Sequence, residues 1–185
     1  PSWCSARQVL YWVDIERPAV FRYDPERGQT GRWPMPSTVG CAVPTKEGEL
    51  LFADDDGFGI LSLETGAART VAAVEGHLPG NRFNDGKVDS RGRFWAGRVD
   101  SEFRHPTGSL YRMDPDYSVS RIETGMICSN GLGWSPDDRI MYFTDSVARK
   151  IWSYDFNVED GTIRNRRVFA EFSEDDGMPD GLTVD

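Results

Sequence analysis

The chain has 185 residues, of which 38% are hydrophobic and 28% are charged, and this composition is typical of a folded globular protein. Its formal net charge is -9, which argues against nucleic acid or an anionic membrane as a partner, because both favour basic patches. No apolar run reaches the roughly 20 residues that a membrane-spanning helix needs, and no signal peptide is recognisable. We therefore predict a cytoplasmic protein.

Three cysteines and two histidines limit the chemistry further. Cys4, Cys41 and Cys128 are odd in number and widely spaced, so we expect neither a disulfide scaffold nor a cysteine zinc site, and a reducing compartment fits best. His77 and His105 stand in no HExxH motif, no GxSxG motif occurs, and both histidines are expected in loops. The predicted chemistry therefore depends on oxygen ligands and carboxylates.

Short apolar and aromatic runs recur along the chain in place of long amphipathic helices, which predicts an all-β fold. In each repeat an aromatic run is followed, after a short polar link, by a second run that ends at or near an acidic residue. If Tyr11, Leu51, Phe94 and Met141 are equivalent, the repeats are spaced by 40, 43 and 47 residues. A repeat of about 40–50 residues made only of strands is typical of a β-propeller blade. A β-sandwich with accidental spacing is the alternative.

Each repeat predicts four strands in the same order. The aromatic run is the second strand and the acid-ended run is the third. An inner strand precedes them, and in two repeats it is expected at residues 87–89 and 132–134. A fourth strand closes the repeat and is expected at residues 29–33, 67–72, 119–122 and 166–169.

These repeats divide the chain into predicted blades, which cover about residues 1–40, 41–83, 84–128 and 129–179. Residues 180–185 match the opening strand of a further blade. We therefore expect an incomplete propeller of about four blades plus one opening strand, cut at both ends from a larger ring. An open ring leaves strand edges bare, so this chain expressed alone is expected to bind metal poorly and to show no activity.

One set of polar residues occurs at equivalent positions in successive repeats. Asp85 precedes Phe94 by nine residues, Asn130 precedes Met141 by eleven, and Asp180 stands at the matching place in the unfinished unit. Inner strands line the channel of a propeller, so equivalent positions at their starts meet at one mouth. Amide and carboxylate oxygens there suit a hard divalent cation such as Ca²⁺ or Mg²⁺. Asn-Gly and Asp-Gly are also turn signals, but here they precede apolar strands.

Two further acidic runs are interpreted as loops. Residues 54–57 resemble part of a calcium-binding loop but lack its downstream glutamate, so a solvated turn is predicted. Residues 174–176 are likewise expected in a solvated loop.

Several motifs together indicate a known family. The run Asn-Arg-Phe-Asn-Asp-Gly-Lys-Val-Asp at residues 81–89, with Gly-Arg-Phe-Trp-Ala-Gly at residues 92–97, resembles the signature of the regucalcin (senescence marker protein)/gluconolactonase/luciferin-regenerating-enzyme family. Ser-Asn-Gly-Leu-Gly-Trp-Ser at residues 129–135 and Pro-Asp-Gly at residues 179–181 follow in that family's order. The resemblance implies a six-bladed propeller with one divalent metal in its channel. Ca²⁺ is the favoured ion, and Mg²⁺, Zn²⁺, Mn²⁺ and Fe²⁺ stay open.

The same resemblance implies roles for individual residues. Asn130 and Asp180 match two metal ligands of the family, and Asp180 also matches its proposed general base. Arg82 and Asn84 match substrate-contacting positions, and Asp85 lies beside them as a further substrate-binding candidate.

Two family positions differ in this chain. The third metal ligand is a glutamate that would fall two residues before Pro1 and is absent from the sequence. Where several members carry a substrate-binding glutamate, this chain has Arg104, with Glu102 nearby. The sugar specificity is therefore open.

The expected function is divalent-metal-dependent hydrolysis of sugar lactones. A metal polarises the lactone carbonyl and activates water, a carboxylate takes a proton from that water, and arginine and asparagine side chains hydrogen bond the substrate. The partner is a small lactone, and the protein is a monomer or homodimer. The alternatives are a related propeller hydrolase of phosphotriesters or aryl esters, and a non-catalytic binding propeller, which the Tyr-Trp-Val-Asp run at residues 11–14 favours.

Overall fold

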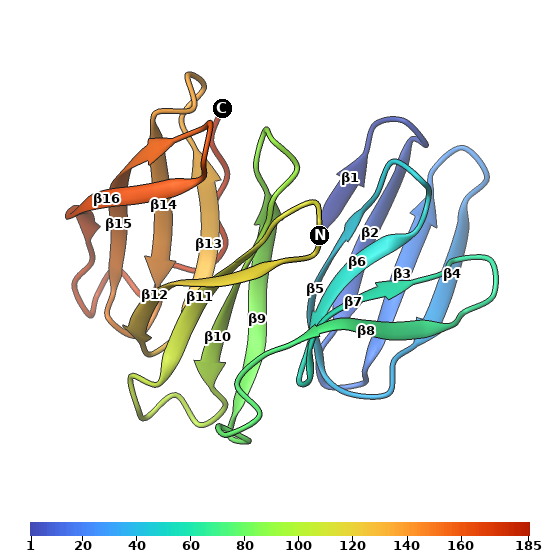
Figure 1. The fold of residues 1–185 in the computed structure, drawn as a ribbon, viewed down its shortest axis with the longest axis horizontal. Coiled ribbons are helices and arrows are strands. Elements are labelled where there is room, and N and C mark those ends of the chain that lie inside the picture. The colour runs from blue at the N-terminus through green and yellow to red at the C-terminus, as the bar shows by residue number, and fades with distance from the viewer. The chain divides into compact units, whose positions relative to one another are not determined.

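The computed structural model describes residues 1–185 and contains sixteen strands joined by turns. The strands form four antiparallel sheets, each of four consecutive strands (Figure 1). This arrangement confirms the predicted all-β fold built from four-stranded units. No helix long and apolar enough to cross a membrane is present.

Each sheet takes its strands in chain order. The first sheet contains β1 (Ser2–Cys4), β2 (Val9–Asp14), β3 (Ala19–Asp24) and β4 (Gln29–Pro34). The second contains β5 (Val39–Pro44), β6 (Leu50–Asp54), β7 (Gly57–Leu61) and β8 (Ala68–Ala73). The third contains β9 (Asn81–Val88), β10 (Phe94–Asp100), β11 (Gly108–Met113) and β12 (Val119–Met126). The fourth contains β13 (Ser129–Trp134), β14 (Ile140–Asp145), β15 (Lys150–Asn157) and β16 (Thr162–Glu171).

The chain forms two compact units, residues 1–83 and residues 84–185. In the first unit, the core contains side chains from both of its sheets, among them Tyr11 from β2 and Phe52 from β6. In the second unit, the core includes Trp95 from β10 and Phe143 from β14, which are both fully buried. The aromatic runs are thus the second strands of their sheets, and burying each such side chain contributes roughly 1.5–3 kcal/mol.

The inner strands are longer than the sequence predicted. β9 begins at Asn81 and β13 begins at Ser129, so both extend further towards the N-terminus than expected. As a result, Asn84 and Asp85 lie within a strand. Asn130 also lies within a strand, where the pairing of β13 with β14 shifts register between Ser129 and Leu132. Such a bulge changes the direction of side chains beside it. Residues 180–185 lie outside the strands.

The aspartates that end the second strands hold turns together. Asp54 is 2% exposed, and its carboxylate accepts hydrogen bonds from the backbone N–H groups of Asp56 and Gly57. The solvated turn predicted at residues 54–57 is therefore wrong for Asp54, because the turn folds around its carboxylate. Asp100 and Asp145 are buried at the corresponding ends of β10 and β14 and also accept backbone N–H groups.

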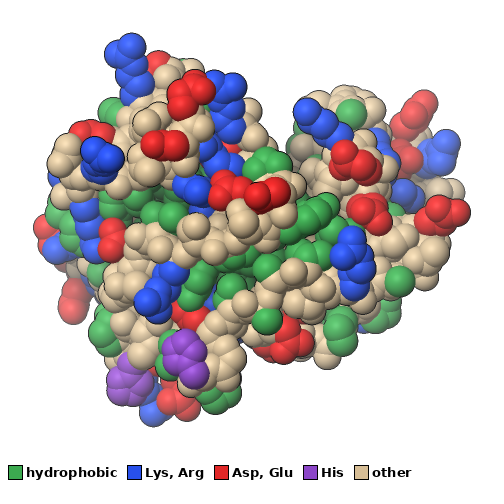
Figure 2. Space-filling model, viewed as in Figure 1, with side chains coloured by type: hydrophobic (Ala, Val, Ile, Leu, Met, Phe, Trp, Pro, Cys, Tyr) green, Lys and Arg blue, Asp and Glu red, His purple; other side chains and the backbone are tan.

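The two histidines lie outside the strands, as the sequence predicted. The three cysteines are free and buried, and His77 and His105 are exposed in turns. On the face shown in Figure 2, Lys and Arg side chains lie among Asp and Glu side chains in each unit. The surface charge on this face is therefore mixed.

Candidate metal centre

Asn130 is held in the bulge of β13 and is only 8% exposed. Its Nδ2 donates a hydrogen bond of 3.0 Å to Oγ of Ser146, the residue that directly follows β14. Because the amide nitrogen is engaged in this way, Oδ1 is the atom that Asn130 can offer to a cation.

Asp180 is brought next to the bulge by the C-terminal segment, which runs beside β13 (Figure 1). The backbone N–H of Gly131 donates to the carbonyl of Asp180 at 3.2 Å. A Cβ atom at Gly131 would lie 2.4 Å from the backbone nitrogen of Leu182, and one at Gly133 would lie 2.7 Å from its Cδ1. These two glycines therefore provide the space that this approach needs. Asp180 itself is exposed.

β9 contacts both β13 and the C-terminal segment. Nδ2 of Asn84 donates to the carbonyl of Ser129 at 2.9 Å, and Nζ of Lys87 donates to the carbonyl of Leu182 at 3.3 Å. Three segments that are far apart in the sequence thus meet, and they bring Asn84, Asp85, Asn130 and Asp180 into one neighbourhood.

Asp85 carries a perturbed carboxyl group in this neighbourhood. Burial raises its pKa above the usual aspartate range, and the negative charge of Asp180 acts in the same direction. The backbone N–H of Gly86, which donates to Asp85 at 2.8 Å, and the charge of Lys87 oppose this shift. Asp85 and Asp180 are therefore close enough for their negative charges to repel each other, although burial is the main cause of the shift.

This donor set fits a hard divalent cation. Carboxylate and amide oxygens are the ligands that Ca²⁺ and Mg²⁺ prefer, and a cation would relieve the repulsion between Asp85 and Asp180. The structure contains no group of three or more His, Cys, Asp and Glu side chains that could hold a metal. A site here would therefore combine Asn130 with carboxylates.

The remaining predicted residues lie at or beyond the edge of this neighbourhood. Arg82 is on β9, two residues before Asn84, and its Nη1 donates to the carbonyl of Phe83 at 3.0 Å. Arg104 and Glu102 pair with each other at 3.1 Å in the turn after β10, where their side chains are 70% and 65% exposed. Nothing in this turn holds either side chain in a fixed binding geometry, because exposed ion pairs are weak.

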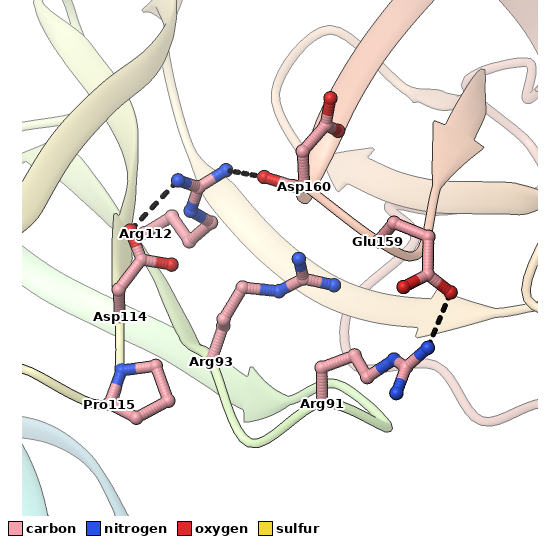
Figure 3. A pocket seen from close by; sticks show the side chains of 7 residues that line it. All are labelled: Arg91, Arg93, Arg112, Asp114, Pro115, Glu159 and Asp160. Carbon is pink, nitrogen blue, oxygen red and sulfur yellow. Dashed lines mark hydrogen bonds and ion pairs between the residues drawn. The ribbon is translucent and has the colours of Figure 1, made fainter.

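A separate cavity of about 390 Å³ lies between the third and fourth sheets of the second unit (Figure 3). Its charged lining residues are already paired: Arg93 with Asp89 at 2.6 Å, Arg112 with Asp114 at 2.8 Å, and Arg91 with Glu159. In addition, Arg93 donates to the carbonyl of Val158, and Arg112 donates to the carbonyls of Asp160 and Gly161.

These bonds fasten the β15–β16 turn to the third sheet, so we assign the cavity a structural role. The backbone carbonyls that accept from these arginines lie 48 and 49 residues away for Arg112 and 65 residues away for Arg93, so no local pattern identified them.

Comparison with known proteins agrees with this architecture. Residues 1–185 match the family described as the SMP-30/Gluconolactonase/LRE-like region. The chain is 35% identical over 190 residues to a regucalcin of Xenopus laevis and 34% identical over 188 residues to an L-arabinolactonase of Azospirillum brasilense. In both cases all of this chain is covered, but only 64% and 62% of the relative.

Among solved structures, a luciferin-regenerating enzyme superposes with a TM-score of 0.93 at 30% identity, over 100% of this chain and 64% of that one. The chain therefore spans less than two thirds of the length of these relatives.

Proposed function

Because the chain belongs to the SMP-30/gluconolactonase/LRE-like family, we propose that the protein hydrolyses sugar lactones with one divalent cation, for which Ca²⁺ is the favoured ion. The family includes relatives named as lactonases, among them the L-arabinolactonase of Azospirillum brasilense. Because this chain spans less than two thirds of its relatives, the proposed substrate and metal are those of the full-length protein.

The observation that carries the proposal is the meeting of β9, the β13 bulge and the C-terminal segment. It brings the segments that carry the amide oxygen of Asn130 and the carboxylates of Asp85 and Asp180 together, and the pKa of Asp85 is raised, mainly by burial and to a smaller extent by the charge of Asp180. This is the electrostatic setting that a divalent cation stabilises.

Within the proposed site, Asn130 and Asp180 are the metal ligands in this chain. The bound cation supplies Lewis acidity, which polarises the lactone carbonyl and favours ionisation of water. Asp180 accepts the proton of the attacking water. Water oxygen bonds to the carbonyl carbon, the ring C–O bond breaks, and the ring oxygen takes up the proton, which gives the open hydroxy acid.

Substrate binding is assigned to β9. Arg82 offers a planar set of donors to hydroxyl or carbonyl oxygens, and Asn84 offers both a donor and an acceptor. Because the Nδ2 of Asn84 already donates to the carbonyl of Ser129, its amide is held in one orientation. Asp85 lies next to Asn84 and can accept hydrogen bonds from sugar hydroxyls.

The proposal is tested by assaying the full-length protein on a panel of aldonolactones, with chelator and after Ca²⁺ is added back. We expect turnover to be lost with chelator and restored by the ion. Asp180→Asn should lower kcat by about 10²–10⁴-fold, the usual contribution of a general base, while Asn84→Ala should mainly raise KM. Asp175→Asn, in the exposed loop after β16, is the matched control.

Four results would contradict the proposal. Turnover that is insensitive to chelator, or near-normal kcat in Asp180→Asn, would exclude the assigned chemistry. Hydrolysis of phosphotriesters or aryl esters without hydrolysis of lactones would indicate the related hydrolase instead. Ca²⁺ binding without turnover of any of these substrates would indicate a binding propeller.

A further inference from the structure

We propose that Ser146 is a positioning residue for Asn130, which it holds with the amide oxygen towards the cation. The inference rests on the proposed function, in which Asn130 is a metal ligand.

The contact between the two side chains is direct and buried. Nδ2 of Asn130 lies 3.0 Å from Oγ of Ser146, and the two residues are 8% and 6% exposed. An asparagine amide has an oxygen end that can bind a cation and an NH₂ end that cannot. A rotation of 180° about its last side-chain bond would exchange these ends. The bond from Nδ2 to the hydroxyl of Ser146 anchors the amide group, and with Nδ2 engaged there Oδ1 is the end left for a cation.

The position of Ser146 is itself fixed by the backbone around the start of β13. The N–H of Ser146 donates to the carbonyl of Cys128 at 3.0 Å. The carboxylate of Asp145 accepts the N–H groups of Ile127 and Cys128, both at 3.1 Å. The end of β14 is therefore tied to the two residues before Ser129, and the hydroxyl of Ser146 is held at a constant place beside the bulge.

The third sheet provides an internal comparison. Ser101 follows Asp100 at the end of β10, just as Ser146 follows Asp145 at the end of β14. Ser101 is exposed, whereas Ser146 is buried. The serine is therefore buried in the sheet that carries Asn130 and exposed in the neighbouring sheet, which makes Ser101 a matched control site.

The test is calorimetric titration of the metal-free, full-length protein with Ca²⁺ alone. We expect Ser146→Ala to weaken Ca²⁺ affinity about 10–100-fold, the usual effect of removing a residue that orients a metal ligand. Ser101→Ala should leave the affinity unchanged. In the Asn130→Ala background, adding Ser146→Ala should weaken the affinity no further, because the residue through which it acts is gone. Far-UV circular dichroism of the chelated variants checks that each is folded.

The outcomes separate this inference from the proposed function. If Asn130→Ala weakens Ca²⁺ binding while Ser146→Ala retains wild-type affinity, the positioning role of Ser146 is wrong, but Asn130 is still supported as a metal ligand. If Ser146→Ala weakens binding equally with and without Asn130, Ser146 does not act through Asn130, and the inference is also overturned. If Asn130→Ala itself retains wild-type affinity, the proposed metal site fails.

Discussion

At the scale of single residues, aspartates with a shifted pKa differ in the cause of the shift. Asp100 and Asp137 have lowered pKa values because they accept hydrogen bonds from neighbouring backbone or hydroxyl groups. Asp54 and Asp85 have raised pKa values because they are buried. Burial is the largest cause for both, and a neighbouring carboxylate adds to each shift, Asp56 for Asp54 and Asp180 for Asp85.

Asp100 gives a prediction for the pH dependence of stability. The N–H groups of Arg104 and His105, each 2.9 Å from its carboxylate, lower its pKa. The contribution of the Asp100 carboxylate to the free energy of unfolding is therefore complete above the unfolded-state pKa of about 3.9. It is lost as the pH falls through the folded-state pKa. We expect Asp100→Asn to lower the urea midpoint of the full-length protein at pH 7, and the difference from wild type to shrink below about pH 4.

The control for this experiment is again Asp175→Asn, in the exposed loop after β16. If the midpoint of Asp100→Asn differs from wild type by the same amount at pH 7 and pH 3, the carboxylate is not the source of the effect.

At the scale of elements, the site depends on how closely the C-terminal segment approaches β13. The bulge at residues 130–131 directs one backbone N–H towards Asp180, and the glycines of this strand leave no side chain in the way. The C-terminal segment also accepts a hydrogen bond from Lys87 on β9. The relative position of the two proposed metal ligands, Asn130 and Asp180, is therefore set by backbone packing.

Gly131→Ala tests this packing. Its Cβ atom would lie 2.4 Å from the backbone nitrogen of Leu182 and 2.8 Å from the carbonyl oxygen of Asp180, so the segment must move away from β13. Overpacking of this kind typically costs about 1–3 kcal/mol. We expect weaker Ca²⁺ binding and lower lactonase kcat in the full-length variant, measured by calorimetry and by the aldonolactone assay.

Gly76→Ala is a suitable comparison, because nothing lies within 4 Å of a Cβ atom at that position. Unchanged Ca²⁺ affinity in Gly131→Ala would show that the close approach of the C-terminal segment does not determine the site.

At the scale of the whole molecule, the proposed cation would connect parts of the chain that are distant in sequence. Asn130 and Asp180 are separated by 50 residues, and Asp85 precedes Asn130 by 45. The site can therefore form only when the third and fourth sheets and the C-terminal segment are folded together. A ligand that binds only the folded state stabilises it.

This connection predicts that Ca²⁺ raises the melting temperature of the full-length protein. At a free Ca²⁺ concentration 100 times the Kd, the expected stabilisation is about 2.7 kcal/mol. Differential scanning calorimetry with Ca²⁺ and with chelator measures it, and the shift should be strongly reduced in Asp180→Asn. A melting temperature that does not depend on Ca²⁺ would contradict a cation site made from these segments.

The repeat in the sequence was sufficient to predict the four-stranded sheets, because strand periodicity, turn residues and blade spacing are local properties. It also identified Asp85, Asn130 and Asp180 as candidates, whereas Arg82 and Asn84 came from the family resemblance, and their metal and substrate roles stay predictions. The starts of β9 and β13 were misplaced, because polar residues in a strand that lines a site do not alternate like those on a surface strand.

Only the tertiary structure decided which side chains support the candidates. The bond from Asn130 to Ser146 joins residues 16 positions apart, and the bond from Gly131 to Asp180 joins residues 49 positions apart. The tertiary structure also assigned Asp54 to a buried turn and the arginines near β10 to the junction between two sheets. These partners come together through the path of the folded backbone, so no local pattern in the sequence specifies them.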